Sequence, residues 1–278
     1  MQPGLAWAIL AALLWGISPI MIDVAMRELD SLGVNAWRNF GGLIVILPAA
    51  LVTGSLAVPL RPLALIVASG IVSQGIGLAT YSESIHRAGP AKAVPISFTY
   101  IFWAQLLGLV LFGEPVGVGT VAGAAVAVAG VWLVASRSGR VGKKRGVALA
   151  IATSVLWALG DSLARGALFE VSPLSTTSWR MVTLTPAFFL ASVRGDRLKA
   201  SLKAIFIAAL SGAVGLGLAL VVYYKAMSEV GLALATIPTS LSPVVSQWLS
   251  RLLLSERLGL REALGGVLVA LGIALASF

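Results

Sequence analysis

Long stretches without a charged residue are the feature that most restricts how this chain can fold. Seven of them have at least 21 residues: 2–22, 39–60, 62–82, 93–113, 115–136, 204–224 and 230–250. A helix needs about 20 apolar residues to cross a bilayer, so each stretch is long enough for one transmembrane helix. The chain is 58% hydrophobic and 11% charged, whereas a soluble domain is about 25% charged. The composition therefore excludes a water-soluble enzyme and indicates a protein that folds in lipid.

Three shorter apolar stretches bring the expected number of membrane helices to ten. They cover 146–160, 181–193 and 263–278. The first run of the chain has no basic segment before it and no clear cleavage site, so we expect a span and not a cleaved signal peptide. The sequence thus predicts an all-α polytopic membrane protein, with helices at about 5–26, 34–53, 63–86, 92–112, 117–135, 147–168, 174–193, 204–227, 232–253 and 260–277.

The second half of the chain repeats the first half without gaps. Uncommon residues recur 142 positions apart: Trp15 and Trp157, Arg38 and Arg180, Tyr81 and Tyr223, Gln105 and Gln247, Glu114 and Glu256. Shared apolar composition does not account for such matches, so an internal repeat is the better explanation. We expect two repeats, at 1–136 and 147–278, joined by a basic linker at 137–146.

Each repeat has five expected helices, and this odd number has a topological consequence. The second repeat must start on the opposite side of the membrane, which relates the two by a pseudo-two-fold axis in the membrane plane. Inverted repeats are common in secondary transporters, whose substrate site lies near the midplane between the repeats. The sequence therefore predicts a secondary transporter that works by alternating access. A channel and an intramembrane enzyme are more distant alternatives.

Each half-repeat resembles the EamA domain of the drug/metabolite transporter superfamily. The matching segments are LLWGISP (13–19) with VLWALGD (155–161), AWRN (36–39) with SWRM (178–181), and the segments 89–114 with 231–256. The resemblance covers nearly the whole chain twice. It implies a multi-pass protein of the cell membrane that exports amino acids or similar small polar metabolites, with drug or lipid export as the alternative. Asp161 departs from the small or polar residue expected at its position, which suggests a subfamily.

Several kinds of chemistry are excluded by residues that the chain lacks. There is no cysteine and only one histidine, so we expect neither a thiol nucleophile nor a histidine-rich metal site. No phosphate-binding loop of the GxxxxGK[ST] type occurs, which argues against an ATPase in this chain. We therefore expect no cofactor and no enzymatic activity. The basic residues lie in short loops, as in membrane proteins, so nucleic acid is not an expected partner.

Asp161 lies deep in the expected helix 147–168 and is the first candidate for a functional residue. A carboxylate at such a depth costs roughly 2.5–3.5 kcal/mol to insert, so it is rarely present without a role. It is suited to bind and release the protons that couple transport. Arg165 follows at i+4 on the same helical face and would instead hold Asp161 in a static ion pair. Both alternatives stay open at the level of the sequence.

Arg38 and Arg180 stand at equivalent places in the two repeats, each directly after a tryptophan. A guanidinium group binds a carboxylate through two hydrogen bonds, so either residue is a candidate for holding a substrate carboxylate. The alternative, which we favour from the sequence, is an interfacial role in which the arginines reach the lipid headgroups beside an interfacial tryptophan.

A larger group of polar and aromatic residues lies on otherwise apolar helices and is expected to line the substrate pathway. Its members are Trp15, Gln74, Tyr81, Ser97, Tyr100, Gln105, Trp157, Tyr223, Tyr224, Thr239, Ser242 and Gln247. Hydroxyl and amide groups suit a small polar solute, but they equally suit hydrogen bonds between helices. For the two tryptophans the alternative is core packing.

Other recurring residues are expected to serve the fold. Glu114 and Glu256 end matching segments next to short loops, and we interpret them as cap or loop residues. Ser69, Ser73 and Gly77 follow the small-xxx-small spacing that lets helices approach closely, which needs no further function.

The basic residues also bear on orientation. The side that would hold both termini has 3 Lys and Arg residues and the other side has 15, with Arg38 and Arg180 left out. This bias favours a cytoplasmic linker and outside termini, whereas the resemblance favours termini in the cytoplasm. Expected partners are a small-molecule substrate, protons and the lipid bilayer; the sequence leaves the oligomeric state open, with a monomer as one alternative.

Overall fold

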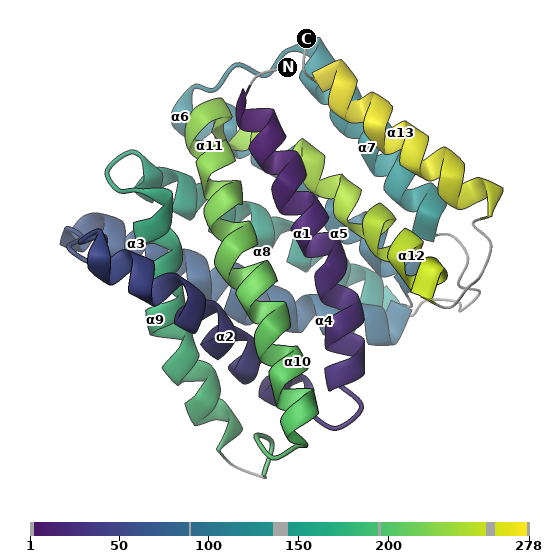
Figure 1. Cartoon of the computed structure of the whole chain (residues 1–278). Coiled ribbons are helices and arrows are strands. Elements are labelled where there is room, and N and C mark those ends of the chain that lie inside the picture. The colour runs from purple at the N-terminus through teal and green to yellow at the C-terminus, as the bar shows by residue number, and fades with distance from the viewer. Residues whose placement is uncertain (1–2, 89, 136–143, 194–195, 254–258, 277–278) are drawn as a thin grey trace.

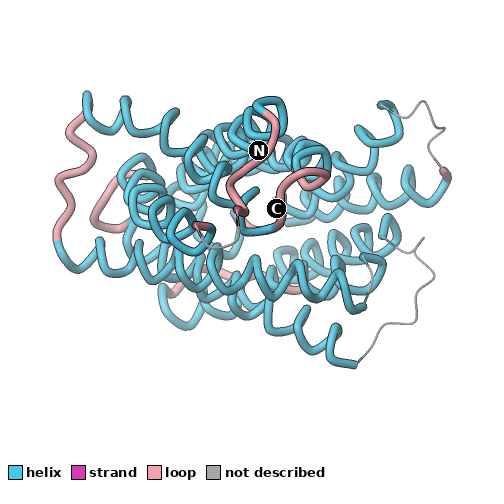
Figure 2. The backbone as a smooth tube through the Cα atoms, turned by 90° about the horizontal axis from the view of Figure 1, so that it is seen from below, coloured by secondary structure: helices cyan, strands magenta, loops and turns pink. Residues whose placement is uncertain are grey.

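The protein is described by a computed structural model that covers residues 3–88, 90–135, 144–193, 196–253 and 259–276. All regular elements in these ranges are helical (Figures 1 and 2). They are α1 (Pro3–Ala25), α2 (Ser31–Val52), α3 (Leu60–Ser69), η1 (Gly70–Gly77), α4 (Leu78–Ala88), α5 (Pro90–Phe98), α6 (Tyr100–Phe112), α7 (Val118–Ala135), α8 (Lys144–Leu168), α9 (Pro173–Ser192), α10 (Leu202–Gly212), η2 (Ala213–Leu218), α11 (Ala219–Ala235), η3 (Ile237–Ser240), α12 (Leu241–Leu253) and α13 (Leu260–Ala276). These helices group into the ten expected segments, which confirms the fold class.

Six segments are long and apolar enough to cross a bilayer by length and composition. They are Pro3–Ala25, Ser31–Val52, Leu60–Ile85, Ala93–Phe112, Lys144–Leu168 and Leu202–Ala235. Two further helices, Val118–Leu133 and Ala263–Ala276, are apolar but shorter. Large apolar side chains such as Leu51, Val110 and Leu190 are more than half exposed on the outside. Such a surface is stable when lipid covers it, because lipid tails are as apolar as these side chains.

The second helix of each repeat begins at a cap formed in the same way. The Asp30 side chain accepts a hydrogen bond from the backbone N–H of Gly33, at 2.8 Å, at the start of α2. Ser172, 142 positions later, accepts one from the backbone N–H of Ser175, at 3.0 Å, at the start of α9. Each cap satisfies a backbone donor that the first turn of a helix leaves free.

Several expected spans are interrupted where glycine or proline weakens the α-helix. The wide π-helical turns η1 and η2 replace α-helix at equivalent places in the two repeats and contain five glycines between them. In α11, Gly231 has a φ of 82°, which breaks the helix, and the 3-10 turn η3 follows around Pro238. Glycine adopts such a φ without strain. The sequence predicts continuous helices at 63–86, 204–227 and 232–253, and η1, η2 and η3 correct that expectation, whereas the break at Gly231 falls between two expected spans.

Reciprocal contacts between the halves show the two-fold relation directly. Trp37 Nε1 donates a hydrogen bond to the backbone carbonyl of Leu198, at 3.2 Å. Its equivalent, Trp179, donates to the carbonyl of Leu56, at 3.1 Å, and Leu56 is itself equivalent to Leu198. Each repeat is thus tied to a loop of the other through the same bond. These tryptophans are therefore fixed to the partner repeat rather than free at the membrane interface.

The fifth helices of the two repeats, α7 and α13, lie side by side at one edge of the molecule (Figure 1). Gly123 and Gly130 of α7 face Gly272 and Gly265 of α13, so closely that a Cβ on either α7 glycine would lie 2.5 or 2.6 Å from a facing carbonyl oxygen. Gly123 is equivalent to Gly265 and Gly130 to Gly272, so the pairing is again reciprocal. Small residues let the two backbones touch, as is common between membrane helices.

Two ends of the bundle can now be distinguished. The terminal end is where α1 begins at Pro3 and α13 ends at Ala276 (Figure 1). The linker end is the opposite one, where α7 ends at Ala135 and α8 begins at Lys144.

Glu28 joins the two repeats at the linker end and leads to a prediction on pH. Its carboxylate accepts hydrogen bonds from the Ser201 N–H at 2.7 Å and from the Ser201 hydroxyl at 2.9 Å. The bond to the Ser201 N–H is the main reason why the pKa of Glu28 lies below its ordinary value of 4.5.

A carboxylate whose pKa is lowered by folding stabilises the fold at a pH above its unfolded pKa, and that contribution is lost as the pH falls through the folded pKa. We expect Glu28→Gln to have a lower melting temperature than the wild type at pH 7. This difference between the two proteins should become smaller below about pH 4.5. A pH-independent difference would contradict this linkage.

Candidate functional site

A cavity of about 720 Å³ lies between the two repeats. Its lining includes many of the residues singled out from the sequence, namely Trp15, Arg38, Gln74, Tyr81, Tyr100, Trp157, Asp161, Arg180, Tyr223, Thr239, Ser242 and Gln247. They come from the first and second repeats alike. Ser18, Ser73, Phe98 and Ser246 also line the cavity. A concave, largely apolar site with a few polar groups is the usual form of a small-molecule site.

The cavity extends from the middle of the bundle toward the linker end. Trp15 and Ile22, which line it, lie in the second half of α1, and Val131 lies near the end of α7. Both helices start at the terminal end, since Gly123 of α7 packs against Ala276. The cavity lining therefore extends into the half of the bundle near the linker end.

Aromatic side chains form two equivalent walls of the cavity. The ring centroids of Trp15 and Tyr223 are 5.0 Å apart, and those of the equivalent pair Trp157 and Tyr81 are 4.9 Å apart. Each pair contains one residue from either repeat, so both walls belong to the interface between the repeats. Trp15 Nε1 also donates a hydrogen bond to the carbonyl of Gly215, at 2.7 Å, within the π-turn η2. The indole is thereby held in place beside the cavity.

Arg180 is buried at the cavity wall and is surrounded by hydrogen-bond acceptors. Its guanidinium donates to Gln74 Oε1 at 3.0 Å and to Ser69 Oγ at 3.1 Å. It also donates to the hydroxyls of Ser73 and Tyr224. Ser69 and Ser73 were expected only to allow close helix packing, so their role as acceptors is a correction. An arginine in this position binds side chains and not lipid headgroups.

Arg38 is buried as well, with 7% of its surface exposed, but its surroundings differ. Its Nη1 donates to Asn35 Oδ1 at 3.1 Å, whereas its buried Nε has no hydrogen-bond partner. The headgroup role favoured from the sequence for the two arginines is therefore wrong for both. The tryptophan beside each points to a loop of the other repeat, and the arginine points to the cavity.

Asp161 is half-buried at the cavity and accepts a hydrogen bond from the Tyr223 hydroxyl at 2.8 Å. Among the described residues it forms no ion pair with Arg165, because Arg165 binds Glu114 instead. The i,i+4 ion pair considered from the sequence is therefore not formed. Asp161 stays available to a proton or a solute in the cavity.

Glu114 forms more contacts than the cap or loop position predicted from the sequence indicates. It is buried and accepts hydrogen bonds from Arg165 Nε at 2.8 Å and from the backbone N–H groups of Leu232 and Ala233, both at 2.9 Å. The two N–H groups follow the break at Gly231, where a new helical turn begins with free donors. Glu114 is a loop residue, as the sequence predicts, and it caps the helical turn that follows Gly231, but it is buried and forms the centre of a network at the terminal end. Glu256, its equivalent, lies outside the described residues.

Arg165 also makes a cation–π contact with an aromatic ring. Its guanidinium lies 4.3 Å from the ring centre of Phe169, and Phe169 packs against Phe112 with centroids 5.6 Å apart. Groups from α6, α8 and α11 are therefore locked together on the side of the cavity away from the linker end.

Three of the residues expected in the pathway lie outside the cavity lining. Gln105 donates to the backbone carbonyl of Thr120, at 3.2 Å, so it joins α6 to α7. Ser97 is buried and its hydroxyl has no hydrogen-bond partner. Tyr224 lies behind the wall as a partner of Arg180. For Gln105 and Tyr224 the alternative of hydrogen bonds between helices holds.

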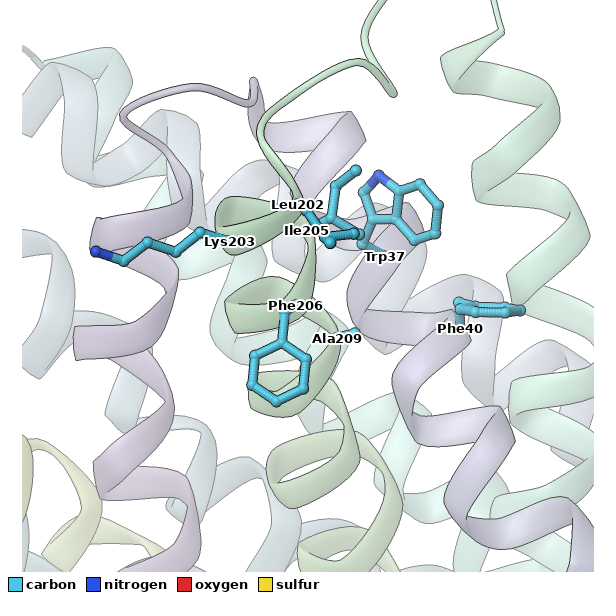
Figure 3. Close-up of a pocket in the computed structure, with 7 residues that line it drawn as sticks. All are labelled: Trp37, Phe40, Leu202, Lys203, Ile205, Phe206 and Ala209. Carbon is cyan, nitrogen blue, oxygen red and sulfur yellow. The ribbon is translucent and has the colours of Figure 1, made fainter.

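A second hollow, of about 490 Å³, lies on the outer surface between α2 and α10 (Figure 3). It is lined by Trp37, Phe40, Leu202, Lys203, Ile205, Phe206 and Ala209, and Lys203 is the one charged member. Phe206 is 64% exposed there. Such an apolar outer groove is suited to lipid chains and lacks the convergent polar groups of the central cavity.

Among the described residues no group of three or more His, Asp or Glu is placed to hold a metal ion.

Comparison with known proteins decides the kind of molecule to which this cavity belongs. The EamA-like transporter family matches the chain twice, over residues 2–136 and 144–278. The chain belongs to the EamA-like transporter family. Two EamA domains in one chain imply the inverted repeat that the reciprocal contacts show, and they confirm the resemblance to drug/metabolite transporters. This EamA-like protein is therefore a multi-pass membrane transporter of a small-molecule substrate and not an enzyme.

Relatives extend over the whole length of the EamA-like chain. An uncharacterized transporter of Archaeoglobus fulgidus is 24% identical over 266 residues, which cover 95% of this chain and 94% of that protein. A solved crystal structure with 20% sequence identity has a TM-score of 0.83 and covers 100% of this chain and 99% of its own. At that identity the structure bears on the fold alone.

Proposed function

We propose that this EamA-like protein exports amino acids or similar small polar metabolites across the cell membrane by alternating access, coupled to protons at Asp161. The observation that carries the proposal is the cavity between the repeats, whose lining includes Asp161 and two arginines. Transporters with inverted repeats bind their substrates in this place. Intramembrane carboxylates commonly serve as proton relays.

The difference between the linker end and the terminal end of the bundle supports alternating access and export. The cavity reaches toward the linker end, while the network of Glu114 and Arg165 holds the terminal end together. The excess of basic residues favours a cytoplasmic linker end, and the proposal adopts this orientation. In that orientation the cavity receives its solute from the cytoplasm. Release then requires the repeats to rock so that the linker end closes and the terminal end opens.

The experiment measures counterflow of labelled amino acids in liposomes that contain the purified protein, with and without an imposed pH gradient. We expect saturable flux that the gradient drives. Asp161→Asn is expected to lower gradient-driven flux by at least about tenfold, because the amide cannot carry a proton. Asp23→Asn is the matched control, since Asp23 is 80% exposed on the surface and lies 3.9 Å from Arg27.

Each result has a distinct meaning. Gradient-driven flux that survives in Asp161→Asn would remove Asp161 from coupling. Flux that neither saturates nor shows counterflow would indicate a channel. Flux of lipids or apolar drugs, with none of any amino acid, would replace the proposed substrate class and leave the family unchanged.

A further inference from the structure

The two equivalent arginines of the cavity differ in how completely they are bonded. Arg180 donates to four side chains, those of Ser69, Ser73, Gln74 and Tyr224. Arg38 has one side-chain acceptor, Asn35, and its buried Nε has no partner. The repeat gives both residues the same place on their helices, so the difference lies in what surrounds each guanidinium.

The missing acceptors around Arg38 are not replaced by an acid. Among the described residues no carboxylate lies within 4.0 Å of its guanidinium, and Asp161, the acid of the cavity lining, bonds to Tyr223. The lining thus combines two guanidinium groups with one carboxylate. A buried cation without a counter-ion is costly unless a ligand supplies one.

We infer that Arg38 binds a carboxylate of the transported solute, while Arg180 holds the repeats together and does not recognise the solute. The inference rests on the proposed function and narrows its substrates to solutes that carry a carboxylate. A guanidinium presents two parallel N–H donors to such a group, Arg38 lines the cavity, and its Nε is a buried donor without a partner. Asn35 Oδ1 holds the Nη1 side of the fork in place.

The aromatic walls suggest a probe for this site. Trp15, Tyr81, Trp157 and Tyr223 flank the cavity, so a solute with an apolar ring fills it better than a small acid does. Phenylalanine has both an acid and an amine. 3-Phenylpropionate keeps only the acid, and phenylalaninamide lacks the acid but keeps the amine.

The first test is a comparison of the dissociation constants of these three compounds for the wild-type protein in detergent, from ligand-dependent thermal stabilisation. We expect phenylalanine and 3-phenylpropionate to bind at least about tenfold more tightly than phenylalaninamide, since the charged hydrogen bonds need the carboxylate. No variant is needed for this comparison. Equal or tighter binding of the amide would overturn the inference.

The second test assigns the preference to one arginine. Arg38→Gln is expected to reduce the preference for the acids to below about threefold, and Arg38→Lys to retain part of it, because an ammonium attracts a carboxylate without the fork. Arg180→Lys is the matched control: it is expected to lower thermal stability without ligand and to keep the preference. A preference that persists in Arg38→Gln, or that is lost only in Arg180→Lys, would overturn the assignment.

Failure of this inference and failure of the proposed function give different results. Binding of 3-phenylpropionate with no counterflow of any amino acid would refute the amino-acid class and support the carboxylate site. Counterflow of amino acids with no loss in Arg38→Gln would support export and refute the role of Arg38. Absence of binding by all three compounds would overturn the inference.

Discussion

Glu114→Gln is expected to destabilise the protein by about 3 kcal/mol, because it leaves the charge of Arg165 buried without its partner. The side chains of Glu114 and Arg165 are only 8% and 12% exposed, and the carboxylate also binds two backbone N–H groups. A glutamine has one acceptor oxygen for three donors. The measurement is equilibrium unfolding in detergent micelles.

The control for this variant is Glu170→Gln. Glu170 pairs with Arg61 at 3.1 Å, but Arg61 is 82% exposed, and exposed pairs contribute about 0–1 kcal/mol. A double variant, Glu114→Gln with Arg165→Met, should lose less stability than Glu114→Gln alone, since no uncompensated charge remains. A single variant as stable as the wild type would contradict the buried network.

The same substitution is expected to loosen the terminal end. The chain has no cysteine, so one introduced at the fully buried Ala235 would be the sole site of thiol labelling. We expect this cysteine to be labelled faster when Glu114 is glutamine, because the helix break at Gly231 then loses its carboxylate cap. An unchanged labelling rate would mean that the network stabilises the fold without holding this end closed.

Gly212→Ala is expected to disrupt the contact between α10 and α2 and to cost at least about 3 kcal/mol, at the upper end of overpacking effects. A Cβ at Gly212 would lie 1.8 Å from the backbone carbonyl oxygen of Arg38. A carbonyl of a helix cannot rotate away, so one helix must move. The shift would also displace Arg38 in the cavity, and transport should fall together with stability.

Gly75→Ala is the matched control, because nothing lies closer than 3.9 Å to a Cβ at that position. Its thermal stability is expected to equal or slightly exceed that of the wild type, since alanine favours a helix over glycine. Equal thermal stabilities of Gly212→Ala and Gly75→Ala would show that α2 and α10 can separate at little cost.

The sequence predicts the fold better than the site, and the helices show why. Hydropathy over 20 residues identifies a span because every turn contributes to the signal. The internal repeat is likewise found by adding up many matches, of which Trp15 with Trp157 is one. Local interruptions such as the 3-10 turn η3 around Pro238 depend on a single residue and its neighbours in space, which hydropathy does not report.

Partners in the site were harder to predict because they lie far apart in sequence. The i,i+4 rule pointed from Arg165 to Asp161, but Glu114, 51 residues away, is the partner. Helical spacing places two residues on one face without saying which other helix that face meets. The identity of Glu114 with Glu256 was the available signal, since a recurring acid at a span end is hard to explain by solvation alone.

The bond between Glu114 and Arg165 is another place, besides Arg38 and Arg180, where the two repeats differ. The position equivalent to Arg165 is Asp23, an acid, so no ion pair of this kind can form between the corresponding side chains at the linker end. In the alternating-access cycle proposed above, this bond would contribute to one end state, and the two equivalent side chains, both acids, could not form it in the other. A free-energy difference of 1.4 kcal/mol changes a population ratio about tenfold. In the proposed cycle, a single exchange of charge in one of two duplicated halves would therefore give a nearly symmetric transporter a preferred resting side.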